Sequence, residues 1–201
     1  MLLNLSKSVN LGEPGINFCT KQILKLGIIL MGIRLGFSDM LDFGIKGLIV
    51  VMPCILSTFV IIKYSRKFFN LKINLATLIA VGTSVCGATA IVATAPLINA
   101  KREETAFAIA NITIFGLIAM MIYPIFANFI FSENTVSVGL FLGSSIHETA
   151  QVFAASTIYS DNYIAPKVVE VSTVTKLVRN SMLIFVIPFV VYSNKIKNDS
   201  N

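Results

Sequence analysis

Two stretches of this sequence decide its fold: GTSVCGATAIVATA at 82–95 and GSSIHETAQVFAAS at 143–156. Both place glycine, serine and threonine at the centre of long apolar segments. Glycine costs about 1 kcal/mol in a helix interior, and hydroxyl side chains compete for backbone hydrogen bonds. Each stretch therefore predicts a break in a helix. The second also holds the only histidine of the chain, His147, directly followed by Glu148.

The composition around these stretches is that of a polytopic α-helical membrane protein. Hydrophobic residues make up 55% of the 201 residues and charged residues 13%, whereas soluble domains carry about 25% charged residues. The mean hydropathy is +0.81. Several apolar runs reach the roughly 17–25 residues that a helix needs to cross a bilayer, and the alternation of an outer-membrane barrel is missing.

The apolar runs organise the chain as one transmembrane domain. The expected helical segments cover 21–37, 44–62, 73–99, 105–130, 136–159 and 168–192. We divide the domain 1–201 into a first pair of helices within 21–72, a first repeat at 73–131 and a second repeat at 136–192. No cleavable signal peptide is evident, and the three cysteines are scattered and do not form a metal-type pair.

The net charge of +6 does not indicate a nucleic-acid partner, because the positive residues lie mainly in short loops between apolar segments. That distribution follows the positive-inside rule of membrane proteins. The loop KYSRKFFNLK at 63–72 holds four lysine or arginine residues, which makes it cytoplasmic. The lipid bilayer is thus the first partner that the sequence predicts.

The two quoted stretches also resemble each other. Gly82 aligns with Gly143, a serine and a β-branched residue follow in register, and weaker likeness continues downstream to Pro124 and Pro188. We interpret 73–131 and 136–192 as two copies of one unit, with chance similarity among small apolar strings as the alternative. Paired interruptions at corresponding positions of two repeats point to a transporter binding site, although small residues also allow close packing of membrane helices.

The positive-inside rule favours a re-entrant form of both broken segments. If 73–99 enters and leaves on the cytoplasmic side, Lys101 and Arg102 also lie inside. The segment 136–159 then dips in from outside, and the two repeats are inverted. The alternative is a pair of broken helices that cross the membrane. The predicted fold class is accordingly all-α, a polytopic membrane protein with two inverted repeats containing broken or re-entrant helices.

Four ionisable residues lie within these segments: His147, Glu148, Lys176 and Arg179. Such groups normally face a partner or a watery cavity. Lys176 and Arg179 share one helix face with Thr173, and their two positive charges exceed the single negative charge of Glu148. An anion such as sulfate, phosphate or a sulfonate would meet the surplus; the alternative is an ion pair of Glu148 with either cation.

His147 is the residue that can change its charge near neutral pH, so with Glu148 it could carry protons; alternatively it only forms a hydrogen bond to a neighbouring helix. An enzyme is not expected. HETAQ at 147–151 differs from the zinc motif H-E-x-x-H by Gln151, and the chain has no second histidine. We expect neither a metal nor another cofactor.

Five strings carry a resemblance to a known family: LGIILMGIRL, GTSVCGATAIVATAPLI, AIANITIFGLIAMMIYP, GSSIHETAQV and TVTKLVR. They resemble the sulfate-exporter family of YeiH-type conserved bacterial membrane proteins over nearly the whole chain from Lys21 to about Pro188. The resemblance implies a multi-pass protein of the bacterial inner membrane that exports sulfate or a related anion. By motif position it implies substrate-binding roles for Thr83, Ser84, Gly87, Ser144, Ser145, Gln151, Lys176 and Arg179, and proton-coupling roles for His147 and Glu148.

Members of that family are longer, with extra helices on both flanks, so we expect this chain to be truncated at both ends. A transporter core also needs a scaffold to move against, which a homo-oligomer or a partner chain would supply. Two rival functions remain open from the sequence. One is a sodium-coupled transporter of another small anion, since backbone carbonyls at the same breaks suit Na⁺. The other is a non-transporting fragment that needs a partner chain.

Overall fold

Every element that can be described in this chain is a helix. The computed structural model describes residues 37–131 and 134–199, and Leu41–Asn201 form one compact unit. The expected segment at 21–37 lies almost wholly outside the described residues. Within them the all-helical class predicted from the sequence is confirmed.

Among the described residues, three helical stretches are long and apolar enough to cross a membrane: Leu41–Phe68, Arg102–Phe131 and Lys167–Asn194. They belong to α3 (Phe37–Phe68), α6 (Arg102–Phe131) and the successive pair α9 (Lys167–Ser181) and α10 (Leu183–Asp199). The stretches have 28, 30 and 28 residues; at about 1.5 Å per residue each exceeds the roughly 30 Å of a hydrocarbon core. The protein is therefore a multi-pass membrane protein.

The two remaining segments are broken where the sequence predicts. The first consists of α4 (Ile73–Ser84) and α5 (Ala88–Thr94), which continues into the 3₁₀ helix η2 (Ala95–Ile98). The second consists of α7 (Thr135–Ser145) and α8 (Thr149–Tyr163). With 12 residues, α4 spans only about 18 Å, too short to cross the bilayer. In both segments the break begins at the third residue after the aligned glycine.

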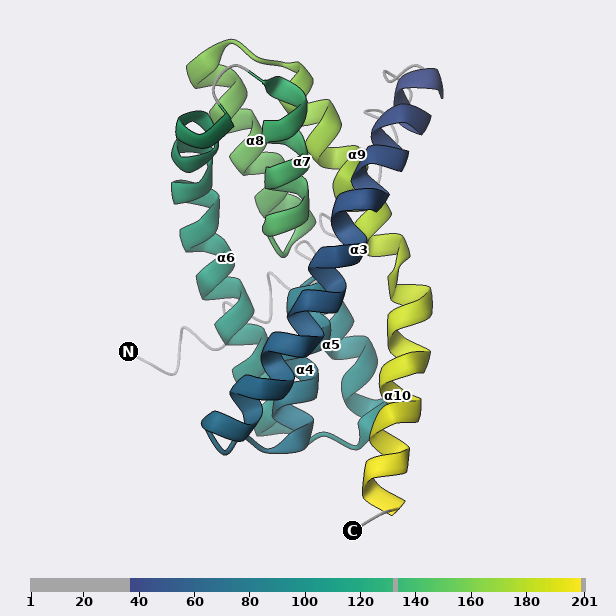
Figure 1. Ribbon diagram of the computed structural model, residues 1–201. Helices are drawn as coiled ribbons and strands as arrows, with labels where there is room; N and C mark the ends of the chain where they lie inside the picture. Colours follow the sequence, from purple (N-terminus) through teal and green to yellow (C-terminus); the bar gives the residue numbers. More distant parts are fainter. Residues whose placement is uncertain (1–36, 132–133, 200–201) are drawn as a thin grey trace, which may run out of the picture. The chain divides into compact units, whose positions relative to one another are not determined.

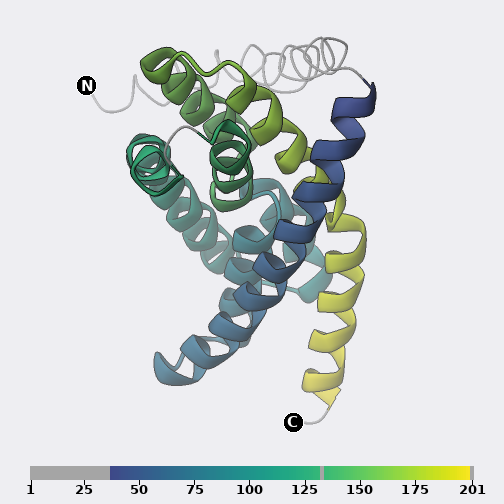
Figure 2. The same cartoon turned by 45° about the horizontal axis from the view of Figure 1, so that its top comes forward.

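Each broken segment forms a hairpin rather than a crossing. In Figure 1, α4 and α5 have their outer ends at the bottom of the view, and α7 and α8 have theirs at the top. The two bends face each other at mid-height, between α3, α6 and α9. Figure 2 shows the same helices with the top turned forward. The arrangement has the re-entrant form favoured by the charge rule, while the internal-repeat relation itself stays a prediction.

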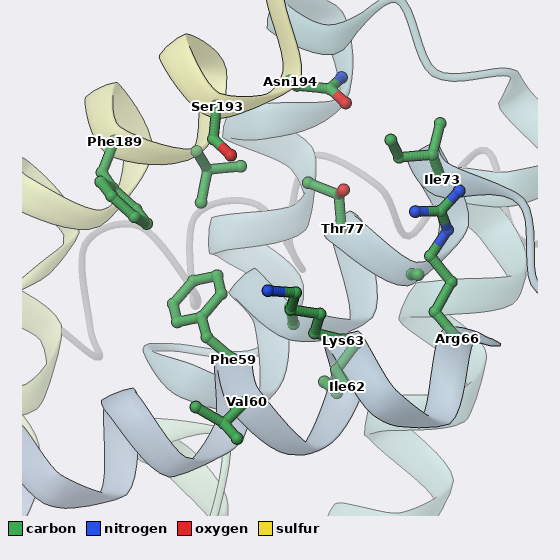
Figure 3. A pocket seen from close by; sticks show the side chains of 13 residues that line it. Phe59, Val60, Ile62, Lys63, Arg66, Ile73, Thr77, Phe189, Ser193 and Asn194 are labelled. Carbon is green, nitrogen blue, oxygen red and sulfur yellow. The ribbon is translucent and has the colours of Figure 1, made fainter. Parts of the chain in front are cut away.

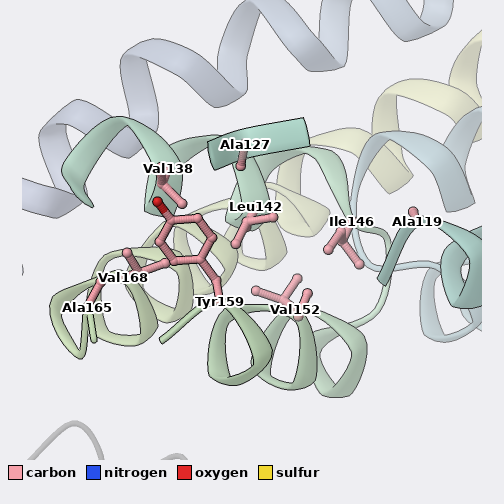
Figure 4. Close-up of a cluster of buried hydrophobic side chains, with 10 residues drawn as sticks. Ala119, Ala127, Val138, Leu142, Ile146, Val152, Tyr159, Ala165 and Val168 are labelled. Carbon is pink, nitrogen blue, oxygen red and sulfur yellow. The ribbon is translucent and has the colours of Figure 1, made fainter. Parts of the chain in front are cut away.

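Three clusters of buried side chains hold the hairpins in place. One joins α6, α7, α8 and the start of α9 around Leu142, Val152 and Tyr159 (Figure 4). A second joins α3, α4 and α10 around Val51 and Val81. A third lies between α4, α5, η2 and α6. Each hairpin thus packs against long helices rather than against water or lipid alone.

The helix α3 extends further than the expected segment at 44–62. It continues through Lys63 and Arg66 to Phe68, because lysine and arginine are good helix formers and no glycine or proline intervenes. The turn comes at Asn70, which has φ of 49°. Similarly, α10 continues past the expected end at 192.

The hairpin form predicts which loops share a side of the membrane. In a variant with the native cysteines replaced by alanine, Asn70→Cys and Asn99→Cys should react with an impermeant maleimide from one side. Asn134→Cys and Asp161→Cys should react from the other. All four positions are exposed. Labelling of Asn99→Cys from the side opposite to Asn70→Cys would indicate that 73–99 crosses the membrane.

The close approach of α7 to α9 makes a second prediction. A Cβ at Gly143 would lie 2.5 Å from the carbonyl oxygen of Ser172 and 2.8 Å from Cβ of Thr175. Gly143→Ala should therefore destabilise the protein by about 1–3 kcal/mol, measured as a lower melting temperature in detergent. The control is Gly44→Ala, where the nearest atom is 4.0 Å away on Val178; an equal loss there would contradict the packing argument.

A candidate ion site at the two helix breaks

The residues of the two breaks touch each other. Gly87 has φ of 67° and ψ of −129°, a conformation that residues with a Cβ rarely adopt. A Cβ at this position would lie 2.9 Å from Cγ of Glu148, in the second break. Glycine at 87 is thus required both by the backbone turn and by the carboxylate side chain that packs against it.

Lys176 reaches both breaks from α9. Its ammonium group donates to the carbonyl oxygen of Val85 at 3.0 Å, to that of Ile146 at 3.1 Å and to that of His147. The residue has no exposed surface. An ammonium group has three protons, so each proton of Lys176 is directed at a backbone carbonyl of one of the breaks.

Arg179 lies one turn further along α9 and also donates hydrogen bonds to backbone carbonyls at both breaks. Its Nε donates to the carbonyl of Ser84 at 3.0 Å, and its Nη1 to the carbonyls of Ser144 and Ile146, the latter at 3.2 Å. Its Nη2 donates to the carbonyl of Thr83. The side chain is 3% exposed. Thr83, Ser84 and Ser144 thus meet Arg179 through their backbone oxygens.

The two cations therefore hold the carbonyl ends of α4 and α7 together. The last carbonyls of a helix have no partner within it, and hydrocarbon offers no water to replace one. The hydroxyl groups of Ser84 and Ser144 are used within their own helices, where they donate to the carbonyls of Val81 and Phe141. The predicted substrate-binding roles of these residues stay predictions.

The charges at the breaks leave a positive surplus. A helix C-terminus is equivalent to about −0.5 of a charge and a helix N-terminus to about +0.5, so the ends of α4 and α7 are balanced by the starts of α5 and α8. The positive charges of Lys176 and Arg179 therefore exceed the single negative charge of Glu148. In the described part of the chain, Glu148 does not form an ion pair with Lys176 or Arg179. The salt bridge there joins Lys46 and Asp42 instead. Glu148 is half-buried and accepts a hydrogen bond from Thr113 of α6 at 3.5 Å.

The ring of His147 is half-buried, and its Nδ1 lies 3.1 Å from the carbonyl oxygen of Ser145. A carbonyl can only accept, so Nδ1 carries the hydrogen and the neutral ring has its lone pair on Nε2. Ser145 thus fixes the tautomer. The arrangement leaves Nε2 as the atom that could take up a proton.

Gln151 and two residues that the sequence did not single out complete the cluster. The amide nitrogen of Gln151 donates to the carbonyl of Thr113 at 3.4 Å, and Asn180 of α9 donates to the hydroxyl of Thr149 at 3.1 Å. The side-chain oxygens of Gln151 and Asn180 are buried, without a donor among the described residues. The signal that could have found Thr113 and Asn180 is their polarity within apolar helices.

Comparison with known proteins places the chain in one family. The family model described as Conserved hypothetical protein 698 matches residues 1–201. The UPF0324 inner membrane protein YeiH of Escherichia coli K12 is 36% identical over 175 residues, covering 85% of this chain and 48% of that protein. The UPF0324 membrane protein plu2856 of Photorhabdus laumondii is 38% identical over 179 residues, with the same coverage.

The chain thus spans about half the length of the curated relatives that it matches. No solved structure matches it. Together with the three helical stretches at 41–68, 102–131 and 167–194 that are long and apolar enough to cross a membrane in the described part of the chain, the relatives' names establish that it is an inner-membrane protein. The family resemblance drawn from the sequence is confirmed.

The carbonyl contacts of Lys176 predict that it is needed for stability. Lys176→Met would leave the carbonyls of Val85 and His147 without their donor, while Ile146 keeps its bond from Arg179. The loss should destabilise the protein by about 2–3 kcal/mol and lower its melting temperature by about 5–10 °C. Thermal unfolding in detergent measures this. Lys46→Met removes an exposed lysine paired with Asp42 and should have little effect; equal losses would contradict the role assigned to the carbonyls.

Proposed function

This chain belongs to the family of Conserved hypothetical protein 698, and on that premise we propose that it forms the core of a secondary transporter for small anions. Sulfate or a related inorganic or sulfonate anion is the proposed substrate, and export is the proposed direction. The protein would move the anion without chemical change, so it is not proposed to be an enzyme. The activity belongs to the whole protein, including any further chain or second copy that completes it.

The observation that carries the proposal is the pair of buried cations between two facing helix breaks. Lys176 and Arg179 lie on α9 where the carbonyl ends of α4 and α7 meet. Helices that break in the middle of a bilayer are a recurring design of ion-coupled transporters. The positive surplus supports an anion rather than a neutral solute, because a buried charge needs a counter-charge.

The three protons of the Lys176 ammonium group are already donated to backbone carbonyls. This lysine would therefore attract the anion mainly through its electrostatic field and not through a direct hydrogen bond. Direct donors would come from elsewhere in the cluster. The first N–H groups of α8, at Thr149 and Ala150, have no acceptor within their helix, and they follow Glu148 directly. Thr83, Ser145 and Gln151 are the further residues for which we propose substrate contact.

Protonation of Glu148 offers a simple coupling mechanism. When this carboxylate is ionised, its negative charge cancels one of the two positive charges of Lys176 and Arg179. When it is protonated, that charge becomes available to an anion. The charged and titratable groups that interact with it are Lys176 on α9 and Cys86 in the first break. His147 is its neighbour in the chain, and Arg179 follows Lys176 one turn along α9. A proton and an anion would therefore bind together, with His147 passing the proton on.

A sodium-coupled transporter is the second candidate, and one observation favours it. The buried side-chain oxygens of Gln151 and Asn180 accept no hydrogen bond from the described residues. Amide oxygens are suitable ligands for a hard cation. Under this alternative Na⁺ would bind beside the breaks and the anion would enter with it. Replacing external Na⁺ by K⁺ would stop sodium-coupled flux and leave proton-coupled flux unchanged.

Glu148→Gln separates the two mechanisms because glutamine mimics the protonated carboxyl group. In proteoliposomes that contain only this chain, we expect the variant to keep sulfate–sulfate exchange but to lose sulfate flux driven by a pH gradient. Radiolabelled sulfate measures both. Glu170→Gln, in the first turn of α9, is the matched control and should behave as the unaltered protein.

Loss of gradient-driven flux in both glutamate variants would contradict the assigned role of Glu148. If the unaltered chain moves sulfate in neither assay although it is correctly inserted, sulfate transport by this chain alone is refuted. The same assay on a full-length relative would then show whether the rest of the longer protein is required.

A further inference from the structure

A cavity separate from the helix breaks opens between α3, α4 and α10. Its volume is about 380 Å³. The walls are mainly apolar, with the rings of Phe59 and Phe189 in edge-to-face contact at a centroid distance of 6.3 Å. Lys63, Arg66, Thr77, Ser193 and Asn194 supply the polar part of the lining (Figure 3).

The polar residues of the cavity gather near the ends of their helices. Lys63 and Arg66 lie in the last two turns of α3, and Thr77 lies one turn into α4. Tyr64 and Tyr192, next to lining residues of α3 and α10, are 71% and 69% exposed. Exposed tyrosines of this kind mark the level of the lipid headgroups in a membrane. The cavity therefore opens where headgroup and acyl chains meet.

The two basic side chains have no acidic partner in the described part of the chain. Arg66 uses its Nε for the carbonyl of Leu71 at 3.4 Å, which leaves its terminal nitrogens to other acceptors. Asn194 is 5% exposed, and its amide nitrogen donates to Asn74 at 3.4 Å. The side-chain oxygen of Asn194 is buried and has no donor among the described residues.

We propose that this cavity binds an anionic phospholipid, with the phosphate between Lys63 and Arg66 and a headgroup hydroxyl donating to the side-chain oxygen of Asn194. An acyl chain covers the apolar wall at Val60 and Phe189. The apolar lining argues against a free inorganic anion, which would need polar partners on several sides. Basic cavities between membrane helices are known to bind lipid headgroups through this combination of basic side chains and apolar surface.

Native mass spectrometry of the full chain, titrated with phosphatidylglycerol or with zwitterionic phosphatidylcholine, tests the proposal. We expect the first phosphatidylglycerol to bind about 30-fold more tightly. Lys63→Ala combined with Arg66→Ala should abolish that preference. Lys101→Ala removes an exposed positive charge that does not line the cavity and should leave it intact. Since Lys63 is exposed and Arg66 only half-buried, these variants are expected to fold.

Asn194→Leu tests the headgroup contact with a different pair of lipids. It should weaken phosphatidylglycerol binding by about 5- to 10-fold and leave phosphatidic acid, which lacks the headgroup hydroxyls, unaffected. Equal affinities for phosphatidylglycerol and phosphatidylcholine would overturn the proposal. So would a loss in Lys101→Ala as large as in the double variant, or the absence of a saturable lipid site.

Discussion

The hydrogen bonds from Lys176 and Arg179 to backbone carbonyls are the constraint on which the rest of this structure depends. A helix that ends inside hydrocarbon leaves carbonyl groups without partners, and each such group costs several kcal/mol. Two helices, α4 and α7, end in this way. A single face of α9 provides donors for both. The hairpins can therefore meet at mid-membrane only because two long cationic side chains lie between them.

The same bonds explain how a structural and a functional role can coincide. Backbone carbonyl oxygens carry only partial negative charges. They therefore accept the hydrogen bonds of the ammonium and guanidinium groups without neutralising the positive charges. The cations are fixed in place, and part of their charge remains. Glu148, which packs on Gly87 and accepts from Thr113, is the acidic group at the breaks to which we assign proton coupling in the proposed mechanism. In the proposed transporter, stability of the breaks and attraction of an anion would thus come from one arrangement, although different atoms serve each purpose.

The sequence predicted the parts of this fold that depend on residue type and spacing. Glycine, serine and threonine within apolar runs located both breaks, and Lys101 and Arg102 favoured the hairpin form. The contacts of Lys176 were not predictable, because a bond to a backbone carbonyl requires no particular residue at 85, 146 or 147. The end of α3 was placed too early, since the basic residues 63–67 mark a membrane boundary but do not end a helix. Thr113 was missed because a single hydroxyl group in an apolar helix has no spacing pattern.

The two halves of the second hairpin are held in different ways. Gly139 and Gly143 bring the backbone of α7 against α9, with ideal Cβ positions 2.6 Å from a side-chain atom of Val171 and 2.5 Å from the carbonyl oxygen of Ser172. The start of α8 is attached by side-chain hydrogen bonds instead, from Gln151 at 3.4 Å and Asn180 at 3.1 Å, and the oxygens of both amides lack donors among the described residues. Close backbone packing thus holds α7 against α9, whereas the polar start of α8 is held by side-chain hydrogen bonds. The polar atoms that an ion could recruit therefore belong to the half of the hairpin whose start is positioned by side chains rather than by close backbone packing.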